Sequence, residues 1–334
     1  MKTANRRQFG LHAASLATLA MLHRPALAAD KFPSKALTLM VPYPAGGASD
    51  VAARIFGEAI GKSLGQPVVV ENLAGGTGLI AATKVLNTAA DGYMFFHGSA
   101  NEIFLAPMLN PAARYKPSDF TLAAATTDAP IVLMVRADLP VQSYDEFIDH
   151  ARKNESAPLT YGTVGIDSMY HLMGDALAAK LGLSFLHVPY KGAAPALQDV
   201  AGGQVDFVIL PYQASFEAMA KQGRLKILTS FSKRLPKEVT NVPLISQSKH
   251  SPDFEYAVGA GYYVRKGTPA DRVSALRKAV GDALVDPAIR ARLEGEGKNI
   301  REPAQSQAQA NQSFDESYQR LRQLVQSVGR KSLA

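Results

Sequence analysis

A glycine-rich turn at residues 41–50, with the sequence VPYPAGGASD, holds the residues best placed to do chemistry. An apolar strand is predicted at residues 36–41 and a helix from Asp50 onward. Prolines cannot extend a strand ladder and glycines leave backbone amides accessible, so the turn can present free N–H groups at a positive helix end. These amides belong to Gly46, Gly47, Ala48 and Ser49. The turn is therefore either an anion site or an ordinary connection with Asp50 as the helix N-cap.

A second turn of the same kind occurs at residues 162–168, with the sequence GTVGIDS. It follows a predicted strand and precedes a helix with an apolar stripe that begins at Met169. Thr163, Gly165 and Ser168 can aim hydroxyl and amide donors at an anion, although a residue of this turn could also simply cap the helix. Two such turns in matching positions favour the binding interpretation.

A cofactor-dependent enzyme is the alternative that the sequence keeps open. Gly76, Gly78 and Ala81 satisfy the dinucleotide fingerprint G-x-G-x-x-A after a strand, which would suit an exported NAD(P)-dependent oxidoreductase. However, the fingerprint follows the second predicted strand, where a dinucleotide-binding unit places it after the first. The next strand also ends in His97-Gly98-Ser99, without the acidic residue that would hold a ribose.

Other catalytic and metal chemistries lack their motifs. The chain has no G-x-S-x-G elbow, no H-E-x-x-H zinc helix and no cysteine, so thiolate ligands, Cys nucleophiles and disulfides are excluded together. His171 and Asp175 lie four residues apart on one predicted helix, but no third metal ligand is evident. We therefore expect no catalytic residue, no metal and no cofactor.

The first 29 residues read as an export signal. Lys2, Arg6 and Arg7 form a basic region, residues 10–22 are weakly apolar, and residues 26–28 offer an A-x-A cleavage site. The adjacent arginines resemble a twin-arginine signal, although such pairs also occur in Sec signals. No stretch approaches the twenty apolar residues of a membrane span, so no stable membrane anchor is expected.

The charge of the chain argues against a nucleic-acid partner. The formal net charge is +7, and removal of Lys2, Arg6, Arg7 and Arg24 with the signal leaves 7 minus 4, about +3. The remaining basic residues are scattered and do not form a stripe that could follow a phosphate backbone.

Alternating strands and helices must position the two turns. Strands are predicted at residues 36–41, 67–71 and 93–97 with helices between them, which indicates a doubly wound parallel sheet. In such a sheet the ligand crevice lies outside the carboxyl ends of the strands, where these turns occur.

A second α/β unit is predicted after two apolar runs, residues 122–125 and 131–135, which lead out of the first. A return strand follows at residues 256–264, and the last helix should pack on the first unit. The predicted domains are lobe 1, residues 30–127 and 258–334, and lobe 2, residues 128–257. Hinges near residues 126–130 and 256–261 would make a clamshell with an interlobe cleft.

Five blocks of sequence resemble, in order, the substrate-binding proteins of tripartite tricarboxylate transporters, also called the Bug family. The blocks are VPYPAGGASDVAAR (41–54), VVENLAGGTGLIAA (69–82), ADGYMFF (90–96), GTVGIDSMYHL (162–172) and VPYKGAAPALQDVAGGQVDF (188–207). The resemblance implies a monomeric periplasmic binding protein of the two-lobed type II fold. It also implies a small organic carboxylate as ligand and a membrane permease of this transporter type as partner.

The resemblance also implies the ligand-binding residues. The first-lobe loop would contribute Tyr43, Ala45, Gly46, Gly47, Ser49 and Asp50, and the second-lobe loop Thr163, Gly165, Ile166, Asp167 and Ser168. Ala100, Asn101, Asp206 and Gln213 are placed by the same resemblance at the floor of the cleft.

Asp167 departs from the family pattern, which usually carries glycine at this point of a G-x-G-S run. A carboxylate there would repel a second ligand carboxylate by about 1 to 4 kcal/mol at 4 Å. This predicts a ligand with a neutral far end, such as a monocarboxylate, unless Asp167 turns outward as a helix cap. The sequence does not name the ligand.

Overall fold

The computed structural model describes residues 31–233, 235–237, 239 and 241–333. The predicted export signal, residues 1–29, lies outside the described residues. Contacts within the chain separate Met1–Ser34 from Lys35–Ala334, and every element named below belongs to the second unit. Within the described ranges, no helix is long and apolar enough to cross a membrane.

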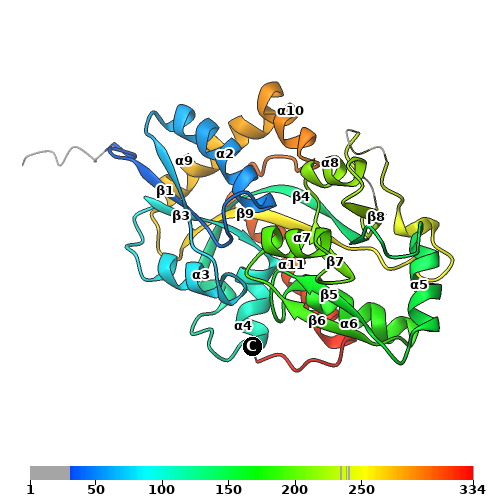
Figure 1. Ribbon diagram of the computed structural model, residues 1–334. Coiled ribbons are helices and arrows are strands. Elements are labelled where there is room, and N and C mark those ends of the chain that lie inside the picture. Colours follow the sequence, from blue (N-terminus) through cyan, green and yellow to red (C-terminus); the bar gives the residue numbers. More distant parts are fainter. Residues whose placement is uncertain (1–30, 234, 238, 240, 334) are drawn as a thin grey trace, which may run out of the picture. The chain divides into compact units, whose positions relative to one another are not determined.

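A first sheet has the strand order β2-β1-β3-β9-β4 (Figure 1). Its parallel part comprises β1 (Leu37–Val41), β2 (Val68–Asn72) and β3 (Met94–Ser99), while β9 (Ala257–Arg265) and β4 (Phe120–Arg136) are antiparallel to their neighbours. The expected parallel sheet is thus confirmed for three strands and extended by two antiparallel ones. The strand β1 is almost wholly apolar because helices cover both faces of the sheet.

Helices flank the first sheet on two sides. In Figure 1, α2 (Ala48–Leu64), α9 (Ala270–Val285) and α10 (Pro287–Gly295) lie above the strands, and α3 (Leu79–Leu86) and α4 (Ala106–Leu109) lie below them. The buried positions of α2 recur at steps of three and four, which places one apolar face against the strands. Short helical turns complete this part: η1 (Gly76–Gly78), η2 (Asn101–Leu105) and η3 (Pro117–Asp119).

A second sheet has the order β4-β7-β5-β6, with β8 on the other side of β4. Here β5 (Leu159–Thr163) is parallel to both β6 (Phe185–Pro189) and β7 (Phe207–Pro211), and β8 (Leu225–Ser230) is antiparallel to β4. The helical segments of this part are α5 (Tyr144–Lys153), α6 (Met169–Leu181), α7 (Ala193–Ala201), α8 (Ser215–Lys221) and η4 (Ile245–Gln247).

The long strand β4 connects the two sheets. Its first half pairs with β9, and its second half pairs with β7 and β8. The two apolar runs that were predicted to lead out of the first unit therefore belong to one strand of 17 residues. The polar segment between them stays extended because β9 supplies its ladder, for example with Thr127 opposite Ala260. The predicted hinge segments lie within this ladder, and the division into two lobes stays a prediction.

The C-terminal helix α11 (Gln307–Ser327) spans from one sheet to the other. Phe314 packs against Phe104 of the first sheet's side, with ring centroids 4.8 Å apart. Beyond the helix, Arg330 reaches Asp175 of α6 at 3.3 Å. The two-residue strand β10 (Asn299–Ile300), just before α11, pairs with the first half of β4.

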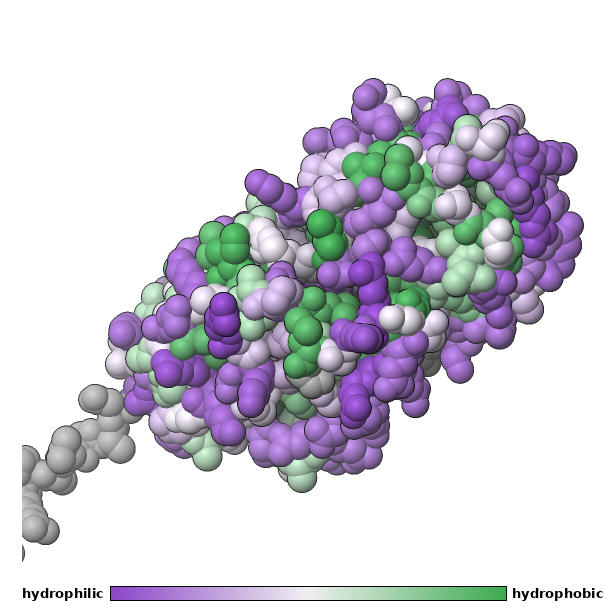
Figure 2. Space-filling view, turned by 90° about the horizontal axis from the view of Figure 1, so that it is seen from below, coloured by the Kyte–Doolittle hydropathy of each residue, from purple (hydrophilic) through white to green (hydrophobic). Residues whose placement is uncertain are grey.

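The surface of the molecule is predominantly hydrophilic on the face seen in Figure 2, where hydrophobic residues form separate patches. The large apolar side chains that are most exposed come from different elements, such as Leu186 in β6 and Val285 in α9. Single exposed apolar residues are ordinary on proteins.

Two topological switch points follow from the strand orders. The chain leaves β1 toward β2 on one side and β3 on the other, and it leaves β5 toward β6 on one side and β7 on the other. Ligand crevices form outside the carboxyl ends of strands at such points. The loops after β1, β3, β5 and β7 are therefore the ones expected to build a site.

Candidate functional site

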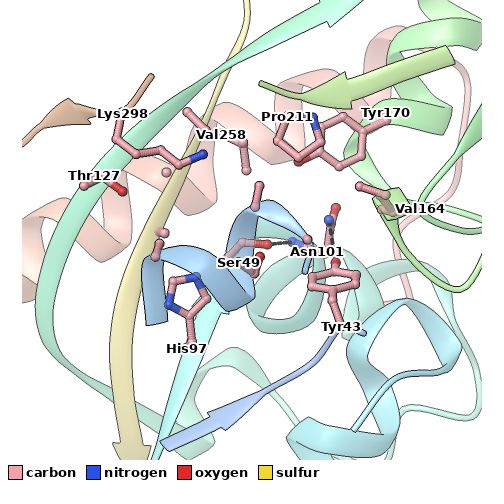
Figure 3. A pocket seen from close by; sticks show the side chains of 18 of the residues that line it. Tyr43, Ser49, His97, Asn101, Thr127, Val164, Tyr170, Pro211, Val258 and Lys298 are labelled. Carbon is pink, nitrogen blue, oxygen red and sulfur yellow. Dashed lines mark hydrogen bonds between the residues drawn. The ribbon is translucent and has the colours of Figure 1, made fainter. Parts of the chain in front are cut away.

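A cavity of about 50 Å³ lies at the carboxyl ends of β1, β3 and β7 (Figure 3). We call it the inner cavity. It is lined by Tyr43, Pro44, Gly47, Ala48, Ser49, Ala52, His97, Ser99, Asn101, Thr127, Ala129, Val164, Tyr170, Ala193, Pro211, Val258, Gly259, Ala260 and Lys298. This volume corresponds to roughly three to five water-sized groups, enough for a carboxylate and the atoms next to it.

A larger space of about 390 Å³, which we call the outer cleft, adjoins the inner cavity. Tyr43 and Val164 line both. The rest of the outer cleft is formed by the turn at η1, the end of α4 and the second-sheet loops. These residues are Gly75, Gly76, Thr77, Gly78, Leu109, Asn110, Pro111, Gly165, Ile166, Asp167, Pro189, Tyr190 and Lys191.

The amino end of α2 faces the inner cavity. The helix begins at Ala48, two residues before the predicted start, and its N-cap Gly47 provides no side-chain cap. Within the described residues, the amides of Ala48 and Ser49 make no hydrogen bond, as expected for the first turn of a helix. Together with the helix dipole, these two amides form a binding site for an anion.

Asp50 holds the first loop and is not the N-cap that the sequence predicted. Its side chain is buried and accepts hydrogen bonds from the Gly46 amide at 2.9 Å, from Asn72 at 3.0 Å and from Arg54. Burial raises the pKa of Asp50, but the bonds from Arg54, Gly46 and Asn72 outweigh it, so the pKa lies below its ordinary value. Gly46 and Asp50 thus bind each other, and their predicted roles as ligand groups stay predictions.

Ala45 and Gly46 lie on the exposed side of this loop and do not line the inner cavity. Gly46 has a φ of +81°, a conformation that only glycine adopts at no steric cost. Gly47 has a φ of −82° and lines the inner cavity. Of the first-loop residues predicted to bind ligand, the structure thus brings Tyr43, Gly47 and Ser49 to the cavity.

Asn101 joins the loops of the two sheets (Figure 3). Its side-chain amide donates to the Tyr43 hydroxyl at 3.0 Å, and its side-chain oxygen accepts from the backbone amide of Met169, the first residue of α6, at 2.8 Å. The side chain is almost completely buried. Ala100, predicted beside it, lines a separate groove under α11 and not the inner cavity.

The polar donors predicted in the second loop have other partners. The Thr163 hydroxyl lies 2.7 Å from Nε2 of His187, and the Ser168 hydroxyl accepts from the His171 amide as the N-cap of α6. Neither residue lines the inner cavity, and their predicted contact with the ligand stays a prediction. Gly165, Ile166 and Asp167 line the outer cleft.

Asp167 points toward a basic residue at the C-terminus. One of its carboxylate oxygens lies 3.6 Å from Arg330 and 3.9 Å from Nδ1 of His171, and the residue has a φ of +55°. Arg330 opposes this charge, but Asp167 lines the outer cleft. The predicted repulsion of a second ligand carboxylate therefore stays a prediction. The helix cap is Ser168 and not Asp167.

Asp206 lies at the wrong end of its strand to reach the site. It precedes β7 and accepts hydrogen bonds from the Thr160 amide and hydroxyl, both at 2.8 Å, and from Arg136. The cavity lies at the opposite, carboxyl end, where Pro211 lines it. Gln213 follows that end but donates to Ser215 and does not line the cavity. The structure gives both residues other partners, and their predicted placement on the cleft floor stays a prediction.

Two charged or titratable residues of the inner cavity were not predicted as site residues from the sequence. Lys298 is 3 % exposed, and its ammonium donates to the backbone oxygen of Tyr212 at 2.8 Å. His97 is also 3 % exposed, and its Nδ1 has no hydrogen-bond partner among the described residues. Burial lowers the pKa of Lys298 to about 8 and, with the Lys298 charge nearby, that of His97 to about 4. No motif marks either residue.

Each of the two loops contacts a segment that follows a strand of the other sheet. The Thr77 hydroxyl donates to the backbone oxygen of Ile166 at 2.9 Å. Gly192, before α7, packs so closely on Pro44 that an added Cβ would lie 2.7 Å from the proline Cδ. These contacts hold segments of the two sheets together beside the inner cavity, and we call this the closed arrangement.

The dinucleotide fingerprint does not form a cofactor site. A Cβ at Gly78 would lie 2.2 Å from Cγ of Glu102, so the close approach that glycine allows is occupied by a side chain of the protein. Glu102 is fully buried, and burial raises the pKa of its carboxyl group. Among the described residues, no cluster of three His, Cys, Asp or Glu could hold a metal.

The buried His97 predicts a loss of stability in acid. Its folded pKa of about 4 lies below the ordinary 6.5, so the unfolded chain takes up this proton first as the pH falls. We expect the free energy of unfolding to decrease between pH 6.5 and 4, with His97 contributing up to roughly 3 kcal/mol. Urea unfolding at pH 7 and pH 4.5 measures this decrease. An equal decrease in wild type and His97→Gln would contradict it.

Comparisons with known proteins show the family and the fold of the chain. The family described as the tripartite tricarboxylate transporter family receptor matches residues 52–330. Protein BugT of Bordetella pertussis is 29% identical, covering 79% of this chain and 80% of that protein. The structure of MatC from Rhodopseudomonas palustris with bound malate is 28% identical, with a TM-score of 0.80, covering 88% of this chain and 100% of that one. A structure of an R. palustris protein with adipate is 27% identical, with a TM-score of 0.82, covering 90% and 99%.

Proposed function

The chain belongs to the tripartite tricarboxylate transporter receptor family, and from this premise we propose that it captures a small organic carboxylate between its two lobes. The family consists of solute-binding receptors and not of enzymes, so the oxidoreductase alternative is abandoned. The relatives with malate and with adipate support a carboxylate as the class of ligand.

The observation that carries the proposal is the amino end of α2 in the inner cavity. The unpaired amides of Ala48 and Ser49 point a positive helix end at a space that no acidic side chain lines, among the described residues. An anion gains from both features, because it accepts the amide hydrogen bonds and meets no like charge. Tyr43, Asn101 and Tyr170 add neutral polar groups at the side toward α6.

The sizes of the two spaces suggest how the ligand lies. The inner cavity has room for one carboxylate and the atoms next to it. A longer acid would extend between Tyr43 and Val164, the residues that line both spaces, into the outer cleft. On this proposal the head group is recognised inside and the outer cleft sets the tolerated length.

Delivery to a membrane permease of the tripartite tricarboxylate type is the second part of the proposal. The export signal predicted from residues 1–29 and the family assignment support a periplasmic protein that passes its ligand to such a permease. We propose that it does so as a monomer, because the inner cavity is built from one chain.

A thermal-shift screen of the chain without residues 1–29 tests the ligand class. The compounds are malate, adipate, smaller monocarboxylates and the corresponding primary amides, each at constant ionic strength. An acid present at 100 times its Kd stabilises the folded state by about 2.7 kcal/mol, which raises Tm measurably, while its amide does not. If none of the acids raises Tm, the protein is not a receptor for carboxylates of this class.

A further inference from the structure

We propose that Lys298 is the counter-ion that receives the ligand carboxylate in the inner cavity. This inference rests on the proposed function and names the residue that pairs with the negative charge of the ligand. Lys298 lies between α10 and β10, far in sequence from the glycine-rich loops that the family resemblance indicates. It is the only residue lining the cavity, in the described part of the chain, with a formal charge at neutral pH.

The surroundings of Lys298 leave part of its ammonium unused. An ammonium carries three N–H donors, and the structure records one hydrogen bond, to the backbone oxygen of Tyr212. The side chain extends toward the cavity, with its nitrogen near Val258 (Figure 3). With the residue 3 % exposed, little bulk water can solvate the remaining donors. A carboxylate in the cavity would satisfy them.

The charged and titratable groups around Lys298 do not replace such a carboxylate. Glu296 precedes it in the chain and raises its pKa slightly, yet burial dominates and lowers the pKa to about 8. His97 approaches from β3 and is neutral at pH 7. Asp50, on α2 beyond His97, is bound to Arg54, Gly46 and Asn72. No ion pair of Lys298 is present within the described residues.

A purely structural lysine offers a comparison within the same chain. Lys226 of β8 also donates to a backbone oxygen, that of Leu139, at 2.6 Å, but it is partly exposed and lines neither the inner cavity nor the outer cleft. A lysine can therefore donate to a backbone carbonyl without burial of its ammonium group. The burial of Lys298 is explained when an anion is its second partner, since a buried charge is stabilised by pairing.

The proposal predicts how affinity depends on charge. Replacing the ammonium by an apolar group removes a charge-assisted hydrogen bond, so Lys298→Met should weaken carboxylate binding about 10- to 100-fold. Binding of a neutral amide should change far less. In wild type, the carboxylate affinity should fall as the pH rises above about 8, because the free protein then loses the ammonium charge. In Lys298→Met this fall should be absent.

Calorimetry with malate and adipate, and with adipamide as the neutral probe, at pH 7 and pH 9.5 tests these expectations. The proteins are the wild type, Lys298→Met and the control Lys226→Met, with urea unfolding to verify that each is folded. Loss of acid binding and of its pH dependence in Lys298→Met alone supports the proposal. Equal acid affinity in wild type and Lys298→Met overturns the role of Lys298 and leaves the proposed function intact. Failure of the wild type to bind malate, adipate or any monocarboxylate of the thermal-shift screen overturns both.

Discussion

Replacing Asn101 by alanine is expected to weaken carboxylate binding by about 30- to 1000-fold. Asn101 is the side chain that hydrogen-bonds both the first loop, through Tyr43, and the amino end of α6, through Met169. Its removal leaves the Met169 amide unpaired and takes one hydrogen bond from the Tyr43 hydroxyl in the closed arrangement, at a total cost of about 2–4 kcal/mol. An open arrangement would let water reach them, so the substitution disfavours closure and reduces affinity in proportion.

Calorimetric titration of Asn101→Ala with the acid identified by the screen measures this loss. Asn154→Ala is the matched control, because Asn154 caps α5 on the surface and takes no part in the site. The control should bind like the wild type. Unchanged affinity in Asn101→Ala would mean that the link between the loops does not govern binding.

Replacing Gly192 by alanine is expected to break the contact between the segment before α7 and the first loop. Gly192 has a φ of +143°, and an added Cβ would lie 2.7 Å from Cδ of Pro44 in the first loop. The ring of Pro44 is rigid, so the loops must separate, and the inner cavity opens to water. We expect a carboxylate affinity at least tenfold lower than in wild type, together with a larger radius of gyration in the presence of ligand.

Gly203→Ala separates the effect of the contact from that of backbone strain. Gly203 also has a positive φ, +72°, but no atom lies within 4 Å of its added Cβ. Both variants should lose about 1 kcal/mol or more of unfolding free energy, because alanine resists this backbone region. Only Gly192→Ala should lose affinity. Equal affinities in the two variants would show that the contact with Pro44 is unimportant for binding.

Local signals predicted the parts of the site that depend on backbone geometry. A strand that ends in prolines and glycines before a helix has few alternatives, and the structure places the first loop at the carboxyl end of β1 as expected. The same holds for the second loop after β5. The alternation of strands and helices also predicted where these ends would meet, because parallel strands present their carboxyl ends at one edge.

Side-chain partners could not be predicted in the same way. Asp50, Thr163 and Ser168 are all suitable for an anion site by type, but each has a closer partner within the fold. Such short-range bonds depend on rotamers and neighbours that the spacing of residues does not specify. Asp206 differs from these three residues, since it lies at the amino end of β7 and not at the carboxyl end.

The topology of the chain explains why Lys298 could not be predicted as a residue of the cavity. Lys298 enters from the segment after α10, and His97 from β3, so they meet only after the chain has crossed between the sheets and returned. The continuity of the strand β4 could not be predicted for a similar reason, because its polar middle is extended through pairing with β9. Contacts between distant segments leave no periodic pattern in the sequence.

A crystal structure of the chain without residues 1–29, grown with the acid that raises Tm most, tests the central claim most directly. We predict that the ligand carboxylate lies in the inner cavity, within hydrogen-bond distance of the Ala48 and Ser49 amides. The rest of a longer ligand should pass Tyr43 and Val164 toward the outer cleft. An acid bound instead in the groove under α11, with the inner cavity filled by water, would contradict it.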